Sequence, residues 1–169
     1  MPMIPFMEKF PELAVAETRS ARVAGHDSLP DGDYGFFELY CNEPGSDCRR
    51  VIVTVLREDT GWRRIWATIS YGWETPDFYR KRLGPLAGTD DWQGPSLDPL
   101  NPQTQYSAEL LNLFRSLIRS PDYVQRLRRH YEIFRAAVEQ GPTGTDRQKP
   151  NSSIQRRRRL RDPRRRRKS

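Results

Sequence analysis

Two cysteines at the ends of one short loop are the residues whose type and spacing most directly suggest chemistry in this chain. Cys41 ends an aromatic run, Cys48 precedes a β-branched run, and residues 42–47 separate them. Three interpretations are open. The thiols could be reduced and partly buried, could bind zinc or another metal together with two further ligands, or could form a disulfide. We expect free thiols, because nothing marks the chain as secreted.

The runs on either side of this loop predict a β-hairpin that positions both cysteines. Residues 34–41 carry apolar or aromatic side chains on both faces, as in a strand near the middle of a sheet. Residues 51–56 form a stronger β-branched run. The loop between them contains Pro44 and Gly45, which favour turns, and it is too long for a two-residue hairpin turn. Such loops carry function more often than strands do.

Three segments of the chain resemble a family of uncharacterised bacterial conserved proteins. They read YGFFELYC…DCRRV, ISYGWE and GPSLDPLNPQ, and the resemblance covers roughly residues 30–135. Relatives often have a further cysteine in the loop, as in CDCRRV, where this chain has Ser46. If the family site is a metal cluster of three thiols, this chain lacks one ligand. The resemblance implies no established activity.

The same segments supply a candidate ligand pocket. Its residues are Cys48, Arg49, Arg50, Asp98 and Asn101. We expect them to form a pocket for an anion or another small ligand, between the loop of residues 41–50 and a strap of residues 84–105. The strap is rich in Pro, Gly, Asp and Asn, and a segment of this length without periodicity is unusual unless it is ordered for a purpose or disordered.

Motifs of known catalytic sites are missing from the sequence. It has no glycine-rich phosphate loop with Lys-Ser/Thr, no HExxH, no GxSxG and no dinucleotide fingerprint. His130 follows Arg126, Arg128 and Arg129, and we expect this group mostly on the solvated outer side of a helix. A phosphate-binding surface continuing from the C-terminal residues is the alternative. The sequence leaves enzymatic activity undecided and favours a binding role.

The remaining patterns predict an α+β fold, with a small antiparallel sheet of three or four strands and a C-terminal αα-hairpin. Strands are expected within residues 14–24, 34–41, 51–56 and 62–71. Helices are expected at 76–83, at 108–119 and from Pro121 to a stop at Gly141. Pro at the first helical position and Gly after the last one are typical helix boundaries.

Charge divides the chain into two parts. Residues 142–169 contain 12 Lys and Arg and 2 Asp, a net charge of +10, whereas the preceding 141 residues contain 17 Lys and Arg and 20 Asp and Glu, a net charge of −3. We therefore predict a globular domain at residues 1–141, a flexible linker at 142–154 and a disordered Arg-rich tail at 155–169.

The tail is expected to bind nucleic acid or another polyanion without sequence preference, because arginine contacts phosphate and releases counterions. An incidental charged end and an anionic membrane surface are the alternatives. In an adaptor of this kind the globular part would contact a protein partner. The basic residues of the tail are Arg156, Arg157, Arg158, Arg159, Arg161, Arg164, Arg165, Arg166, Arg167 and Lys168.

The N-terminal residues and the lengths of the apolar runs indicate the cellular location that we expect for the protein. No run approaches 18 apolar residues, so no membrane span is predicted. Residues 1–10 lack the basic segment and apolar core of a signal peptide. We expect a cytoplasmic protein with two reduced cysteines and, apart from the zinc alternative, no cofactor.

Overall fold

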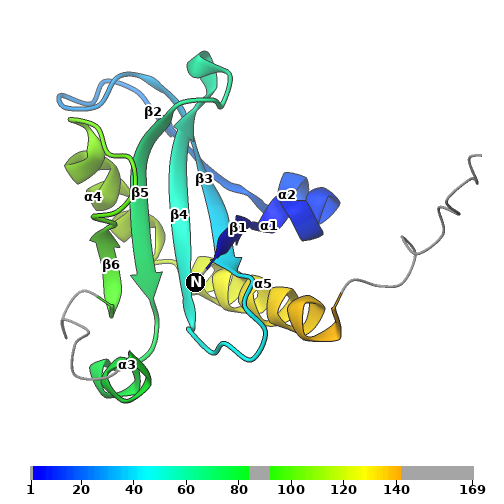
Figure 1. Cartoon of the computed structure of the whole chain (residues 1–169). Helices are drawn as coiled ribbons and strands as arrows, with labels where there is room; N and C mark the ends of the chain where they lie inside the picture. The colour runs from blue at the N-terminus through cyan, green and yellow to red at the C-terminus, as the bar shows by residue number, and fades with distance from the viewer. Residues whose placement is uncertain (1, 84–91, 142–169) are drawn as a thin grey trace, which may run out of the picture.

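A six-stranded antiparallel sheet lies at the centre of the protein (Figure 1). It is seen in a computed structural model that describes residues 2–83 and 92–141. The strands follow the order β1-β3-β4-β5-β6, and β2 also pairs with β3. Their bounds are β1 Met3–Pro5, β2 Arg19–Val23, β3 Gly32–Cys41, β4 Arg50–Arg57, β5 Ile65–Gly72 and β6 Gly94–Leu97.

Within residues 2–83 and 92–141, five α-helices and one short 3-10 helix accompany this sheet. Their bounds are α1 Phe6–Lys9, α2 Pro11–Glu17, η1 Glu58–Thr60, α3 Pro76–Leu83, α4 Ser107–Leu117 and α5 Pro121–Gln140. The predicted helix boundaries at Pro76, at Pro121 and at Gly141 are confirmed. Gly141 has a φ of 70° and a ψ of −178°, a backbone conformation that is essentially restricted to glycine.

The predicted central hairpin and the next strand are confirmed. β3 and β4 pair antiparallel with Phe36 opposite Val55 and Glu38 opposite Val53. β4 pairs in turn with β5, and β2 pairs antiparallel with β3. β-branched and aromatic residues dominate β3 and β4 because their side chains pack well on a covered pleated surface.

The expected count of three or four strands is wrong, because β1 and β6 extend the sheet at its two edges. These strands have three and four residues, too few to show an alternating pattern. Residues 11–17, partly included in the predicted first strand, form the helix α2, which begins with proline at its first position. Neighbouring strands, more than local propensity, determine the pairing of such short segments.

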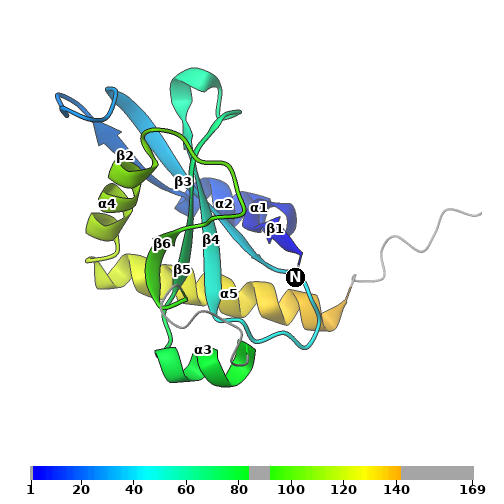
Figure 2. The same cartoon turned by 60° about the vertical axis from the view of Figure 1, so that its left-hand side comes forward.

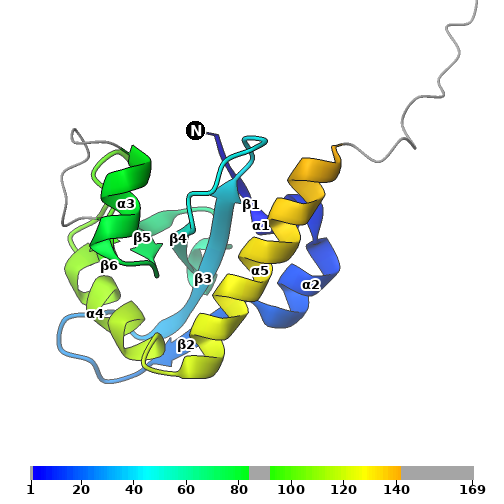
Figure 3. The same cartoon turned by 90° about the horizontal axis from the view of Figure 1, so that it is seen from below.

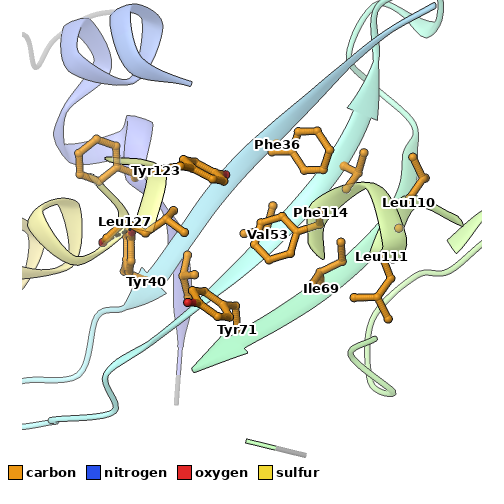
Figure 4. Close-up of a cluster of buried hydrophobic side chains, with 14 of the residues drawn as sticks. Phe36, Tyr40, Val53, Ile69, Tyr71, Leu110, Leu111, Phe114, Tyr123 and Leu127 are labelled. Carbon is orange, nitrogen blue, oxygen red and sulfur yellow. Dashed lines mark hydrogen bonds between the residues drawn. The ribbon is translucent and has the colours of Figure 1, made fainter. Parts of the chain in front are cut away.

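Helices α4 and α5 pack on one face of the sheet, as predicted, and build the core there (Figure 4). Phe114 from α4 stacks against Phe36 at 6.0 Å, and Leu127 from α5 is completely buried. Truncating a buried phenylalanine of this kind to alanine costs about 3–5 kcal/mol. The two helices spread apart from their connecting turn and do not lie side by side as a tight αα-hairpin (Figure 3).

The segment between β6 and α4 runs along the outer edge of β5 (Figure 2). The side-chain amide of Gln103 pairs with the backbone of Thr68, donating to its carbonyl at 2.7 Å and accepting from its N–H at 3.2 Å. The hydroxyls of Thr104 and Ser107 donate to the carbonyl of Trp66. Side chains thus satisfy the edge of β5 beyond the end of β6.

Part of the predicted strap and all of the predicted linker and tail cannot be compared with the structure. Residues 84–91 and 142–169 lie outside the described residues. The described remainder of the strap contains β6 and the ordered segment that follows it. Among the described helices, none combines the length and the apolar character needed to cross a membrane.

Candidate ligand pocket

Arg50 occupies the first position of β4 and projects from the face of the sheet opposite α4 and α5. Successive side chains of a strand point to opposite faces. Val51 and Val53 belong to the core under the helices, so Arg50 and Ile52 point the other way. Directly opposite Arg50 on β5 is Gly72, whose lack of a side chain leaves room above the sheet.

Trp92 uses this room. A Cβ on Gly72 would lie 2.0 Å from the backbone oxygen of Trp92 and 2.5 Å from the hydroxyl of Tyr79, so glycine is required for this close approach. The Arg50 guanidinium lies over the Trp92 ring at 4.2 Å, in a cation–π arrangement that fixes its plane. β4, β5 and the segment before β6 together determine where this cation is placed.

A cavity of about 230 Å³ opens beside the Arg50 guanidinium. Four of the five residues proposed from the sequence line it. They are Cys48, Arg50, Asp98 and Asn101. The other lining residues are Met3, Ile52, Trp92 and Leu100, three of them apolar and one aromatic.

Arg49, the fifth proposed residue, points elsewhere. Its guanidinium donates to Asp47 at 2.9 Å and to Glu74 at 3.3 Å, and it lies 4.7 Å from the Phe78 ring. Its backbone has a φ of 41°, an uncommon value for a residue other than glycine. Because the backbone turns here, Arg49 points toward α3 and the next residue, Arg50, points toward the cavity.

Asp98 is held rigidly at the wall of the cavity. Its Oδ1 accepts hydrogen bonds of 2.9 Å from the backbone N–H of Leu100 and from Nδ2 of Asn101. Its own N–H donates to the carbonyl of Thr68 on β5. This Asx-type turn orients the carboxylate before any ligand arrives. Its second oxygen, Oδ2, lies 3.9 Å from a terminal nitrogen of Arg50, which is longer than a hydrogen bond.

The Arg50 cation is therefore largely buried, and the carboxylate of Asp98 lies near it but beyond hydrogen-bond distance. Its side chain is 13% exposed, and its Nε is buried with no hydrogen-bond acceptor in the part of the chain that the structure describes. Burial lowers the pKa of Arg50, and the charges of Cys48 and Asp98 raise it by less. A largely buried guanidinium in this condition favours a ligand that supplies a hydrogen-bond acceptor, such as a carboxylate group.

The two cysteines lie at the edge of this site and are both free and buried. Cys41 lies 3.4 Å from the hydroxyl of Ser46, the residue that stands where relatives have cysteine. Burial, followed by the charge of Cys41, raises the pKa of the Cys48 thiol. Cys48 is thus a protonated thiol near neutral pH and a weak nucleophile. No group of three or more potential metal ligands is found within the described residues, and zinc binding stays an untested alternative to free thiols.

A buried polar network on the helix side of the sheet was missed at the sequence level. His130 was expected on the outer side of its helix, but its side chain is 1% exposed, so this prediction is wrong. Its Nδ1 lies 2.7 Å from Glu38 on β3, and its Nε2 lies 2.9 Å from Glu17 on α2. Tyr40 donates a further hydrogen bond to Glu38. The signal that could have found it is Glu38 itself, which alternation places on the same face as Phe36 and Tyr40.

The arginines near His130 also have partners in the N-terminal part of the chain. Arg129 pairs with Glu17, and Arg126 donates to the carbonyl of the same residue at 3.0 Å. Arg128 donates to the carbonyl of Trp73. These contacts attach α5 to α2 and to the end of β5, and they account for much of the positive charge on this helix.

Comparison with protein-family models, with curated proteins and with solved structures gives no match. The resemblance to uncharacterised bacterial proteins stays a prediction. What the site can do must accordingly be argued from its geometry.

Proposed function

We propose that this domain binds a small metabolite that carries a carboxylate, in the cavity beside Arg50. The observation that carries the proposal is the buried Arg50 guanidinium, whose nearest described carboxylate, Asp98, lies beyond hydrogen-bond distance at 3.9 Å. A planar guanidinium matches the two oxygens of a carboxylate and binds them in parallel. Stacking on Trp92 holds that plane in place before binding, which reduces the entropy lost on association.

The size of the cavity limits the ligand. About 230 Å³ is below the usual range of roughly 300–1,000 Å³ for drug-sized ligands, so a molecule of a few heavy atoms fits better. Met3 and Ile52 provide an apolar part of the wall, and Leu100 borders the cavity although it is 92% exposed. The polar groups lie at Arg50, Asp98 and Asn101. A few polar groups on an otherwise apolar wall are typical of sites for small organic ligands.

Binding without catalysis is the role that these groups support. The cavity wall contains no histidine among the described residues, and its thiol, Cys48, has a raised pKa. A nucleophile with a base in hydrogen-bond reach is the usual mark of covalent catalysis. The carboxylate of Asp98 is already committed on one oxygen to Leu100 and Asn101.

Replacing Arg50 tests the proposal. We expect Arg50→Gln to weaken binding of leucine and of 4-methylpentanoate by about tenfold or more, since a charge-assisted hydrogen bond contributes about 1.5–3 kcal/mol. Arg50→Lys keeps the positive charge but loses the parallel N–H donors of the guanidinium, so it should weaken binding to an intermediate degree. Isothermal titration calorimetry on the full chain measures the dissociation constants.

Arg49→Gln is the matched control, because the neighbouring arginine is engaged with Asp47 and Glu74 outside the cavity. It should change both dissociation constants by less than about threefold. The proposal is wrong if neither carboxylate binds to the wild-type chain, or if Arg50→Gln binds them as well as Arg49→Gln does. Melting temperatures of the variants show whether any loss reflects unfolding.

A second function is proposed for the C-terminal residues on the ground of their charge. Residues 142–169 have a net positive charge, whereas the first 141 residues have a net negative charge. We propose that residues 155–169 bind nucleic acid or another polyanion non-specifically, next to a domain with a separate ligand. The predicted adaptor role has less support, because the large exposed apolar side chains of the described residues lie on separate segments. They are Met7, Val15, Trp62 and Leu100.

A further inference from the structure

Two opposite charges face each other in the cavity, and both are largely buried. The side chain of Arg50 is 13% exposed and that of Asp98 is 9% exposed, with a terminal nitrogen and Oδ2 separated by 3.9 Å. The pair is too far apart for a direct hydrogen bond, so each partner has bonding capacity left toward the cavity. The local charge of the site is close to zero.

This balance is unfavourable for a ligand that is only an anion. A carboxylate attracted by Arg50 would lie at a similar distance from the negative charge of Asp98, and a buried pair of like charges is costly. A ligand with one positive and one negative group avoids this cost. It would keep the site neutral and give each buried charge its own partner.

The hydrogen-bond donors and acceptors of the wall are arranged like its charges, with donors at Arg50 and acceptors at Asp98 and Asn101. Arg50 offers only donors, which require an acceptor such as a carboxylate. Asp98 uses Oδ1 for Leu100 and Asn101, which leaves Oδ2 as an acceptor toward the cavity. Asn101 donates its Nδ2 to Asp98, so its carbonyl oxygen is a second acceptor on the same wall. An ammonium group has three donors and no acceptor, which suits these two oxygens.

The two groups of the ligand must be close neighbours, because the charges they meet are 3.9 Å apart. In an α-amino acid the ammonium and the carboxylate are attached to the same carbon. The third substituent of that carbon would then meet Met3 and Ile52, beside the exposed Leu100. These side chains favour an aliphatic group by burying apolar surface.

We propose that the ligand of this pocket is a free aliphatic α-amino acid, with its carboxylate on Arg50 and its ammonium on Asp98 and Asn101. This inference rests on the proposed carboxylate site and adds the requirement for the amino group. Asp98 is thereby the residue that distinguishes an amino acid from a simple carboxylic acid. Leucine is a suitable probe because its side chain is branched and apolar.

Three ligands of the same carbon skeleton test the inference on the full-length wild-type chain. Leucine carries both groups, 4-methylpentanoate lacks the ammonium, and 3-methylbutylamine lacks the carboxylate. We expect calorimetric titration to show leucine binding at least tenfold more tightly than either partial ligand. Asp98→Asn should weaken leucine about tenfold and leave 4-methylpentanoate unchanged or tighter, because the repulsive charge is removed while the oxygen that holds Leu100 is kept.

The outcomes separate the inference from the function on which it rests. If 4-methylpentanoate binds as tightly as leucine and both depend on Arg50, the amino-acid inference is overturned and the carboxylate site remains. If the amine binds as tightly as leucine, or if no ligand binds, both proposals fail. If leucine keeps its advantage in a folded Asp98→Asn chain, the assignment of Asp98 is wrong. The wild-type comparison decides the inference even where a variant does not fold.

Discussion

At the scale of single residues, the molecule places two carboxylates against one imidazole under its N-terminal helices. His130 lies between Glu38 and Glu17, and the ring of Phe6 stacks on it at 4.3 Å. A neutral imidazole has one N–H, so both contacts are hydrogen bonds only when the ring is doubly protonated or a carboxyl group carries a proton.

Glu17 makes the pH dependence of this network testable. Burial tends to raise the pKa of Glu17, but the hydrogen bond from His130 and the charges of Arg129, His130 and Arg126 lower it below its ordinary value of 4.5. The ionised carboxylate therefore adds stability that is fully present above pH 4.5 and is lost as the pH falls through the lowered folded-state pKa.

We predict that Glu17→Gln destabilises the chain by about 0.5–1 kcal/mol near pH 7, a modest value because the carboxylate is partly solvated. The difference from the wild-type chain should shrink as the pH falls below 4.5. Urea unfolding at several pH values measures it. Glu12→Gln, an exposed position on the same helix, is the control and should stay within about 0.5 kcal/mol of wild type throughout. A constant Glu17→Gln difference from pH 7 to pH 3 would contradict this account.

The sequence predicted most of the residues that line the cavity, but it did not predict in which direction each side chain points. Cys48, Arg50, Asp98 and Asn101 come from two distant segments, and the structure brings these four to one cavity. Arg49 could not be separated from Arg50, because the positive φ that turns it toward Glu74 depends on contacts with Tyr131 and α3. His130 was misplaced because its two partners are more than 90 residues away in the chain.

At the scale of elements, the long strands were predictable and the short edge strands were not. β3, β4 and β5 are eight to ten residues long, and four or five residues of each are β-branched or aromatic. β1 and β6 are strands because they find partners in β3 and β5, respectively. These two edges also contribute to the cavity, through Met3 on β1 and Asp98 directly after β6. The elements that the sequence failed to predict are thus part of the candidate site.

Gly72, at the end of β5, allows Trp92 to lie close to the sheet beside the cavity. We predict that its substitution lowers both the stability of the domain and its affinity for leucine. A Cβ there would meet the backbone of Trp92 at 2.0 Å and Tyr79 at 2.5 Å, so one of them must move. We expect Gly72→Ala to cost about 1–3 kcal/mol of stability through overpacking. Leucine binding should weaken as well, because Trp92 no longer holds the Arg50 plane.

Thermal unfolding and calorimetric titration check these two effects together. Val15→Ala, an exposed substitution on α2 far from this contact in the chain, is the control and should change neither quantity appreciably. A Gly72→Ala chain with wild-type stability would show that the approach of Trp92 to β5 is not required.

At the scale of the whole molecule, the net positive charge of the sequence lies in residues 142–169, after the described domain. Several arginines of the described domain pair with carboxylates of the same domain, as Arg22 with Asp33 and Arg129 with Glu17 show. Residues 155–169 contain nine arginines and one lysine against one Asp. Because the first 141 residues are net negative, we propose that affinity for a polyanion comes from the C-terminal residues.

We predict that a chain ending at Gly141 keeps its fold and its leucine binding but loses its affinity for non-specific duplex DNA. Binding by the full chain should fall steeply between low and physiological salt, because each neutralised phosphate releases counterions. For 6–10 contacts the loss is about 10³–10⁵ between 50 and 200 mM salt. Fluorescence anisotropy of a labelled duplex at a series of salt concentrations measures both effects.

Charge alone, without sequence order, should set this affinity. A chain with residues 155–169 shuffled, preserving the nine arginines and the lysine, is expected to bind within about threefold of wild type with the same salt slope. Replacing Arg156, Arg157, Arg158 and Arg159 by glutamine should reduce that slope by about four contacts, since each phosphate contact contributes close to one unit. Equal DNA affinity of the full chain and the chain ending at Gly141 at low salt would assign the binding to the domain, and a large loss on shuffling would indicate recognition of a specific order of side chains.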